Sequence, residues 1–135
     1  MATEIYRRAF ADSERPYISF GIPFPETCAF HVANTFNASR VYIVASHSLT
    51  KNTNALRRLE EALGPTVAGL RVGMKSHTYW SEVLEITSDC RACNADLIIT
   101  LGAGSLTDAA KIVSLVRIHY IRVSFLESSK CIARH

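Results

Sequence analysis

The residues best suited to chemistry form a glycine turn, Gly102–Ser105 (GAGS), directly after the apolar run Asp96–Leu101. Glycines at such a turn let the backbone approach a phosphate with no Cβ in the way. A helix predicted from Ser105 onward would direct its free N–H groups and positive dipole end at the phosphate, and the serine adds a hydroxyl donor. Asp108, three residues after Ser105, predicts a capping box. A G-x-G is weak evidence by itself, so a plain turn stays the alternative.

The elements that must position this turn alternate along the chain. Four apolar runs read as strands: Tyr17–Gly21, Val41–Ser46, Val67–Val72 and Asp96–Leu101. Helix-like segments follow them, starting near Pro25, at Asn52 or Thr53, at Ser81 and at Ser105. This order predicts an α/β fold, a Rossmann-like parallel sheet with helices on both faces. In such sheets, ligands bind beyond the carboxyl ends of the strands.

Helical spacing identifies the faces expected to be buried. The residues expected inward are Ala29, Val32, Ala33 and Phe36 in the first helix and Leu56, Leu59 and Leu63 in the second. Gly64-Pro65 ends the second helix. In the third, Ser81 is the expected N-cap and Asn94 the expected left-handed residue at the end.

Composition narrows the function classes. The apolar content of 48% and the charged content of 20% are ordinary for a globular domain. Residues 116–135 hold four basic residues and one acidic residue, which accounts for the whole net charge of +3. No basic face for nucleic acid is therefore indicated. The N-terminus lacks a signal-peptide core and no run reaches the length of a membrane span, which predicts a cytoplasmic protein without membrane contact.

The four cysteines include one CxxC pair, Cys90 and Cys93, in a segment expected to be helical. A structural zinc site needs a second ligand pair. Packing on one side of the helix is the favoured interpretation, and redox or metal use is the alternative.

The glycine turn also carries a resemblance to a known family. The stretch GAGSLTDAAK resembles the GGGSxxDxAK signature of the iron-containing (group III) alcohol dehydrogenases, a superfamily that includes maleylacetate reductase, glycerol dehydrogenase and dehydroquinate synthase. Residues 75–84 (KSHTYWSEVL) are similar to the turn and helix that precede this signature, and YISFG and VYIVAS are similar to the family's opening strands. The similarity covers roughly residues 17–115.

The resemblance implies a site for NAD or NADP. It makes Gly102, Gly104 and Ser105 pyrophosphate contacts, with Ala103 in place of the middle glycine. Asp108 becomes a motif residue at the nucleotide site.

Two further positions follow from the resemblance. His77 and Thr78 would lie near the nucleotide, although Ser76 replaces the usual proline. Ser46 stands where NAD-preferring members often carry an acid, and a neutral serine permits NADP. The neighbouring His47 could assist, but a solvent-exposed loop histidine is the favoured interpretation.

The same resemblance implies a metal whose ligands this chain does not supply. Family members bind Fe²⁺ or Zn²⁺ in a second, helical domain through one aspartate and three histidines. The five histidines here, His31, His47, His77, His119 and His135, show no paired helical spacing. We therefore expect no metal ligands and identify no catalytic residues. The expected organisation is a dinucleotide-binding domain over residues 1–115 and an atypical tail over 116–135, with the C-terminal metal-binding domain absent.

The tail supports two interpretations. One is translated intron or a premature gene-model end, and the other is a divergent native segment that forms an edge strand. For the chain as a whole, the expected function is the NAD(P)-binding portion of a metal-dependent oxidoreductase that interconverts alcohols and carbonyls, with maleylacetate reductase among the candidate activities. The alternative is an inert truncated dinucleotide-binding fragment. A homodimer and pairing with a full-length relative both remain open as assemblies.

Overall fold

The computed structural model describes residues 3–75, 79–102, 104–116, 122–127 and 130–134, with side chains described up to residue 115. The elements are β1 (Ile5–Arg8), β2 (Tyr17–Phe20), α1 (Phe24–Asn34), β3 (Val41–Ala45), α2 (His47–Asn52), α3 (Ala55–Leu63), η1 (Gly64–Thr66), β4 (Val67–Val72), α4 (Trp80–Ala92), β5 (Leu97–Leu101), α5 (Ser105–Val116), β6 (Arg122–Glu127) and β7 (Lys130–Arg134).

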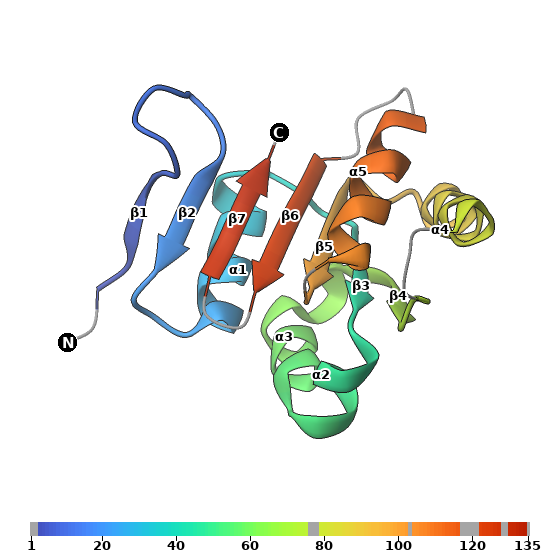
Figure 1. The fold of residues 1–135 in the computed structure, drawn as a ribbon. Coiled ribbons are helices and arrows are strands. Elements are labelled where there is room, and N and C mark those ends of the chain that lie inside the picture. The colour runs from blue at the N-terminus through green and yellow to red at the C-terminus, as the bar shows by residue number, and fades with distance from the viewer. Residues whose placement is uncertain (1–2, 76–78, 103, 117–121, 128–129, 135) are drawn as a thin grey trace.

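All strands join one sheet in the order β1-β2-β7-β6-β5-β3-β4 (Figure 1). The part from β6 to β4 is parallel, which confirms the predicted α/β fold. The expectation that Tyr17–Gly21 belongs to the parallel part is wrong, because β2 pairs antiparallel with β1 and β7. Four residues long, β2 carries no signal in its sequence for the direction in which it will pair.

The segment after Val116 also lies within the sheet. β6 pairs with β5 in parallel, and β7 returns antiparallel to lie between β6 and β2. The edges of the sheet are β1 and β4. The interpretation of this segment as an edge strand is therefore wrong.

Two apolar layers cover the two faces of the parallel strands. On one face, α1 and α3 pack Cys28, Val32 and the three leucines Leu56, Leu59 and Leu63 against alternate residues of β3 and β5. On the other face, α4 and α5 pack Val83, Ile86, Ala109, Ala110 and Val113 against the intervening residues. Figure 1 shows α1 behind the sheet and α5 in front of it. The leucine face of α3 is as predicted. In α1 the buried face is Cys28, His31 and Val32, while Ala33 is exposed.

The order of the strands creates a switch point between β3 and β5. From β3 the chain passes through α2 and α3 to β4 on one side, and then through α4 to β5 on the other side of β3. The connecting helices lie on opposite faces, so the carboxyl ends of β3 and β5 diverge into different layers. A crevice at such a point is where open α/β sheets bind ligands.

Helix starts differ from the sequence predictions at three places. The helix α3 begins at Ala55, with Asn54 as its N-cap, rather than at Asn52 or Thr53. The helix α2 was not predicted, and Ser46 is its N-cap. The N-cap of α4 is Tyr79, so Ser81 lies inside the helix and the predicted cap is wrong. The left-handed Asn94, with φ 53°, is as predicted.

The N-terminal hairpin is held to α1 by a polar cluster. The buried His31 contacts Glu4 through Nε2 and Thr35 through Nδ1, and Ser19 donates to Glu4. Burial alone would raise the pKa of Glu4, but the hydrogen bonds with Ser19 and His31 lower it below the ordinary value. The Glu4 carboxylate therefore joins the segment before β1 to β2 and α1.

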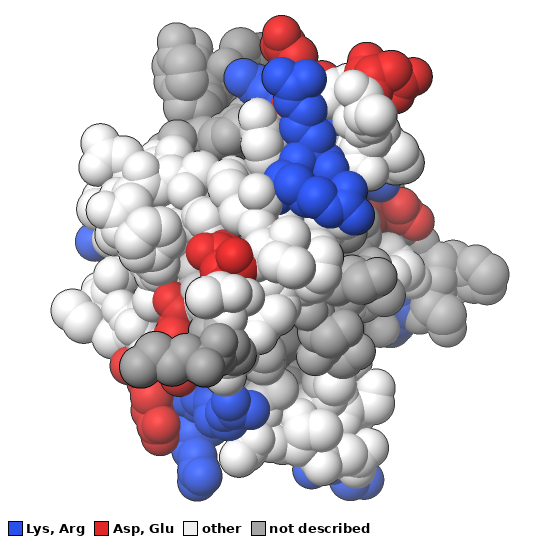
Figure 2. Space-filling view, turned by 90° about the vertical axis from the view of Figure 1, so that its left-hand side faces the viewer, with Lys and Arg blue, Asp and Glu red and all other residues white. Residues whose placement is uncertain are grey.

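The surface seen from the β1 edge carries charges of both signs, separated by uncharged areas (Figure 2). No helix in the described part of the chain is long and apolar enough to cross a membrane.

Candidate functional site

The carboxyl ends of three parallel strands are tied together by backbone hydrogen bonds. The Ser46 N–H, just after β3, donates to the Leu101 carbonyl at the end of β5, over 2.8 Å. The Gly73 N–H, just after β4, donates to the Ala45 carbonyl over 2.8 Å. The segments that follow β3, β4 and β5 therefore begin side by side at the switch point.

Gly102 is required by both its backbone and its surroundings. Its φ is 139°, and a Cβ there would lie 2.8 Å from Leu106 Cδ1 and 3.0 Å from Ser46 Cβ. A larger residue would require the end of the Leu106 side chain to move, would press against Ser46 Cβ and would hold a side chain at a φ that L residues rarely adopt. The sequence therefore needs glycine at this position to bring β5, Ser46 and α5 together.

Gly104 has a different reason to be glycine. Its φ is 65°, and no atom lies within 4 Å of a Cβ built on it, so the space beside it is open. Its carbonyl accepts from the Asp108 N–H over 3.2 Å, which makes Gly104 the N-cap of α5 and Ser105 the first helical residue. The predicted capping box is wrong, because Ser105 does not occupy the N-cap position. The turn thus leaves the first N–H groups of α5 without intrahelical partners next to open space.

The structure brings together four of the predicted site residues: Ser46, Gly102, Gly104 and Ser105. Asp108 lies in the first turn of α5 and is exposed. Ala103, His77 and Thr78 lie outside the described residues.

The Ser46 hydroxyl is used to begin α2. Its Oγ accepts from the Leu49 N–H over 3.4 Å and lies 3.0 Å from Ser48 Oγ. His47 is exposed, as predicted, but it is the first residue of α2 rather than part of a loop. The end of β3 thus presents a helix N-terminus without an acidic side chain.

A groove of about 520 Å³ lies beside the carboxyl ends of β3 and β4 and was not predicted from the sequence. Its lining includes His47, Gly73, Lys75 and an ion-paired set formed by Arg71, Glu82 and Glu85. Gly73 has φ 84°, and its own Cβ would lie 3.5 Å from that of His47, so the groove begins next to Ser46. The available signal was Arg71, which interrupts the apolar pattern of β4.

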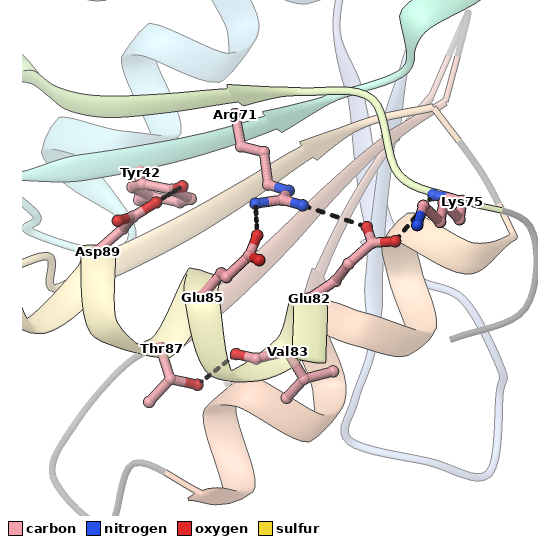
Figure 3. Close-up of polar contacts among 8 residues, drawn as sticks. All are labelled: Tyr42, Arg71, Lys75, Glu82, Val83, Glu85, Thr87 and Asp89. Carbon is pink, nitrogen blue, oxygen red and sulfur yellow. Dashed lines mark hydrogen bonds and ion pairs between the residues drawn. The ribbon is translucent and has the colours of Figure 1, made fainter. Parts of the chain in front are cut away.

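Figure 3 shows the Arg71 side chain reaching from β4 toward α4, with a glutamate on each side. Its Nη1 donates to Glu85 Oε2 over 2.7 Å, and its Nη2 donates to Glu82 Oε2 over 3.2 Å. Burial alone would lower the pKa of Arg71, but the hydrogen bonds to Glu85 and Glu82 raise it above the ordinary value. The guanidinium charge is therefore balanced by two carboxylates of α4.

A second polar contact with α4 comes from Tyr42 of β3, which lies beside Gly69 of β4. A Cβ at Gly69 would lie 2.7 Å from Tyr42 Cδ2, so the glycine leaves room for the tyrosine ring. The Tyr42 hydroxyl donates to Asp89 Oδ2 over 2.9 Å (Figure 3). Burial and then this hydrogen bond raise the pKa of Tyr42 well above its ordinary value. The two residues that weaken the strand pattern, Gly69 and Arg71, thus serve the contact with α4.

The CxxC pair packs along α4. Cys90 is fully buried, and Cys93 Sγ lies 3.8 Å from the Cys90 carbonyl. In the described part of the chain, no three His, Cys, Asp or Glu side chains come together as a metal site would need. We therefore derive no chemical step through a metal.

The comparisons with known proteins agree with this arrangement. The family model for iron-containing alcohol dehydrogenase matches residues 22–131. The chain belongs to the iron-containing alcohol dehydrogenase family. It is 41% identical over 131 residues to dehydrogenase FUM7 of Gibberella moniliformis, an alignment that covers 96% of this chain and 30% of that protein. It is 47% identical over 81 residues to dehydrogenase ALT3 of Alternaria alternata, covering 59% of this chain and 21% of that protein.

Solved structures of the family share the fold. Maleylacetate reductase from Agrobacterium tumefaciens superposes with a TM-score of 0.64 at 20% identity, over 86% of this chain and 36% of that one. NADH-dependent butanol dehydrogenase A from Thermotoga maritima superposes with a TM-score of 0.65 at 18% identity, over 74% of this chain and 25% of that one. At these identities the likeness concerns the fold alone.

Two facts about extent follow from these matches. The chain spans about a third or less of the length of the curated relatives it matches. The family match reaches residue 131, so it includes most of the segment after Leu115 that the sequence pattern sets apart. The resemblance thus extends beyond residues 17–115, and the loss of resemblance that suggested translated intron is not observed. A domain boundary at residue 115 stays a prediction.

Proposed function

We propose that this chain is the dinucleotide-binding portion of an NAD(P)-dependent oxidoreductase of the iron-containing alcohol dehydrogenase family. The observation that carries the proposal is the turn Gly102–Ser105, which lies at the switch point of the sheet and opens α5. Gly104 has open space beside it, and the unpaired N–H groups of the first turn of α5 adjoin that space. A pyrophosphate fits this combination of open backbone and helix dipole.

The two halves of the dinucleotide would extend to either side of the turn. In related folds, the adenosine ribose lies near the end of a strand that neighbours the glycine turn. Here that position is Ser46, from which the groove with His47 and Gly73 continues. Ser46 is neutral, and both glutamates that line the described part of the groove are paired with Arg71, so no unpaired acid of this groove faces a 2′-phosphate next to Ser46. We infer that both NAD and NADP are accepted.

The reaction class proposed is interconversion of an alcohol and a carbonyl. The bound nicotinamide would supply the hydride, and this chain would bind and orient the dinucleotide. Substrate contacts cannot be assigned to residues of this chain, so the test of substrate class is a panel that includes butanol and maleylacetate.

The binding part of the proposal is tested on the purified 135-residue chain. Titration of NADH and NADPH, followed by nicotinamide fluorescence, should give saturable binding. Replacing Ser105 with alanine should weaken binding by about tenfold or more, since one hydrogen bond to a charged group contributes roughly 1.5–3 kcal/mol. The matched control is Ser114→Ala on the same helix, whose hydroxyl donates to the Lys111 carbonyl, and binding should be unchanged. Equal weakening in the two variants, or no binding by the unsubstituted chain, would refute the proposed site.

A second candidate is a chain that binds the dinucleotide without turning it over. It is favoured because no metal-binding group of three side chains occurs among the described residues. Alcohol-dependent reduction of NAD(P)⁺ with added Fe²⁺ or Zn²⁺ distinguishes the two candidates. Turnover by the purified chain would exclude the inert one, and binding without turnover would support it.

A further inference from the structure

Glu82 is a buried acid whose two oxygens are both engaged. Its side chain is 8% exposed. Oε2 accepts from Arg71 Nη2, and Oε1 accepts from the backbone N–H of Lys75, each over 3.2 Å (Figure 3). A glutamate in the first turn of a helix commonly bonds to the helix's own N-cap region. Glu82 instead reaches across to the strand before the helix and to the segment that follows that strand.

These contacts fix the backbone after β4 at two points. At Gly73 the N–H is bonded to the end of β3, and at Lys75 the N–H is bonded to α4 through Glu82. Arg71, still within β4, holds the other oxygen of the same carboxylate. The segment 73–75 is therefore held between the neighbouring strand and the following helix.

The segment held in this way forms one wall of the groove next to Ser46. Gly73, Lys75 and Glu82 all line that groove, and His47 lines it from α2. The groove lies near the switch point, because a Cβ built on Gly73 would lie 3.5 Å from His47 Cβ and one built on Gly102 would lie 3.0 Å from Ser46 Cβ. A shift of the backbone at 73–75 would thus change the width of the space beside the glycine turn.

Charge argues against Arg71 as a direct phosphate ligand. Two carboxylates already balance the guanidinium of Arg71. The ammonium of Lys75, which also lines the groove, lies over the Tyr79 ring, 5.6 Å from its centre. The ion pairs of Arg71 with Glu82 and Glu85 thus hold residues 73–75 in place rather than attract an anion.

We propose that Glu82 is a positioning residue for nucleotide binding. By holding the Lys75 backbone, it fixes the position of residues 73–75, which form one wall of the groove next to Ser46. This inference rests on the proposed dinucleotide function. In Glu82→Gln one of the two oxygen positions becomes an NH2 donor, so either Arg71 or the Lys75 N–H faces a donor in place of its acceptor. Glu82→Asp keeps the charge but is one methylene too short to reach both groups.

The matched control is Glu85→Gln. Glu85 contacts the same guanidinium over a shorter distance, 2.7 Å, but is 60% exposed and makes no contact with Lys75. The two substitutions remove the same charge from the same arginine, and only one of them releases the segment after β4.

The experiment measures amide hydrogen exchange at Lys75 and dissociation constants for NADH and NADPH, well below the unfolding temperature. We expect Glu82→Gln and Glu82→Asp to lose protection at Lys75 and to bind both dinucleotides about fivefold to tenfold more weakly. Glu85→Gln should change the protection at Lys75 by less than twofold and should weaken binding less than Glu82→Gln does.

Each other outcome refutes a stated claim. If either Glu82 variant loses protection at Lys75 and binds as tightly as the unsubstituted chain, Glu82 has a structural role only. If Glu85→Gln weakens binding as much as Glu82→Gln, the effect comes from charge and not from positioning. If the unsubstituted chain binds neither dinucleotide, the proposed function itself fails, and the inference fails with it.

Discussion

The segments that follow β5 and β4 both begin at the carboxyl ends of the parallel strands, but different interactions determine their conformations. After β5, the turn is set by two glycines with φ of 139° and 65°, one packed against its neighbours and the other beside open space. After β4, a single glycine begins the segment, and a buried carboxylate on α4 then holds it at Lys75. The conformation of the first turn depends on φ angles that glycine permits, and that of the second depends on hydrogen bonds made by charged side chains.

The difference shows which parts of a site are encoded locally. The two glycines permit the positive φ angles of 139° and 65°, so the residue types of Gly102–Ser105 themselves indicate a turn at this position. The position of residues 73–75 depends on Arg71 and Glu82, which are 11 positions apart in the sequence. We expect substitutions at the first turn to act through strain and substitutions at the second to act through loss of a partner.

The largest effect is expected at Gly102. Alanine there would carry a side chain at φ 139° and place its Cβ 2.8 Å from Leu106. Backbone strain and overpacking each cost about 1–3 kcal/mol, so Gly102→Ala should lower the free energy of unfolding by about 3 kcal/mol. Urea denaturation followed by circular dichroism measures this loss. A cost below about 1 kcal/mol would mean that the turn is less closely packed than the structure indicates.

The next largest effect is expected at Arg71, whose ion pair with Glu82 helps to hold the segment after β4. Arg71→Met keeps the length of the side chain and removes its charge, which leaves the buried Glu82 without one of its two partners. An unsatisfied buried group costs about 1–3 kcal/mol, so we expect a loss of about 2 kcal/mol in the same denaturation experiment. The exposed partner is the control, because Glu85→Gln should cost no more than about 0.5 kcal/mol. A similar cost for both variants would contradict the assignment of Glu82 as the buried partner.

A smaller effect is expected at Gly104, which shares the turn with Gly102, but where a Cβ would have no atom of the other described residues within 4 Å. Gly104→Ala should add only the strain of an alanine at φ 65°, about 1 kcal/mol. The measurement is the difference in unfolding free energy between Gly104→Ala and Gly102→Ala. If the two variants were equally unstable, packing against Leu106 and Ser46 would not be the reason for glycine at position 102.

The smallest effect concerns how stability depends on pH at the N-terminal hairpin, which Glu4 joins to α1. The pKa of Glu4 is lowered in the folded state, so its stabilising contribution is complete above the ordinary value of 4.5 and is lost as the pH falls through the folded pKa. The unsubstituted chain should lose up to about 1 kcal/mol more than Glu4→Gln between pH 5 and the acid limit. Parallel stability profiles for the two proteins would show that Glu4 makes no such contribution.

The features that follow from short-range patterns could be predicted from the sequence. The strand Leu97–Leu101, the buried leucines of α3 and the start of α5 at Ser105 each depend on a few adjacent residues. The turn Gly102–Ser105 belongs with them, because glycine permits the positive φ angles that other residues rarely adopt.

The features that depend on long-range pairing could not be predicted. β2 enters the sheet by pairing antiparallel with β7, which lies more than 100 residues later in the chain. The role of Gly73 becomes evident only when the ends of β3 and β4 are seen side by side, and that of Glu82 only when α4 is placed against β4. Arg71 weakens the apolar pattern of its strand, yet its partners could not be identified from spacing alone.

The central claim is that the turn at the switch point binds the pyrophosphate of NAD(P). A chain of 15.0 kDa is well suited to ¹H–¹⁵N correlation spectra during titration with NADPH. We predict the largest amide shifts at Gly104, Ser105 and Leu106, with smaller shifts at Ser46 and Gly73, and saturation at a single dissociation constant. Shifts confined to other parts of the chain, or unchanged spectra at millimolar NADPH, would contradict the account.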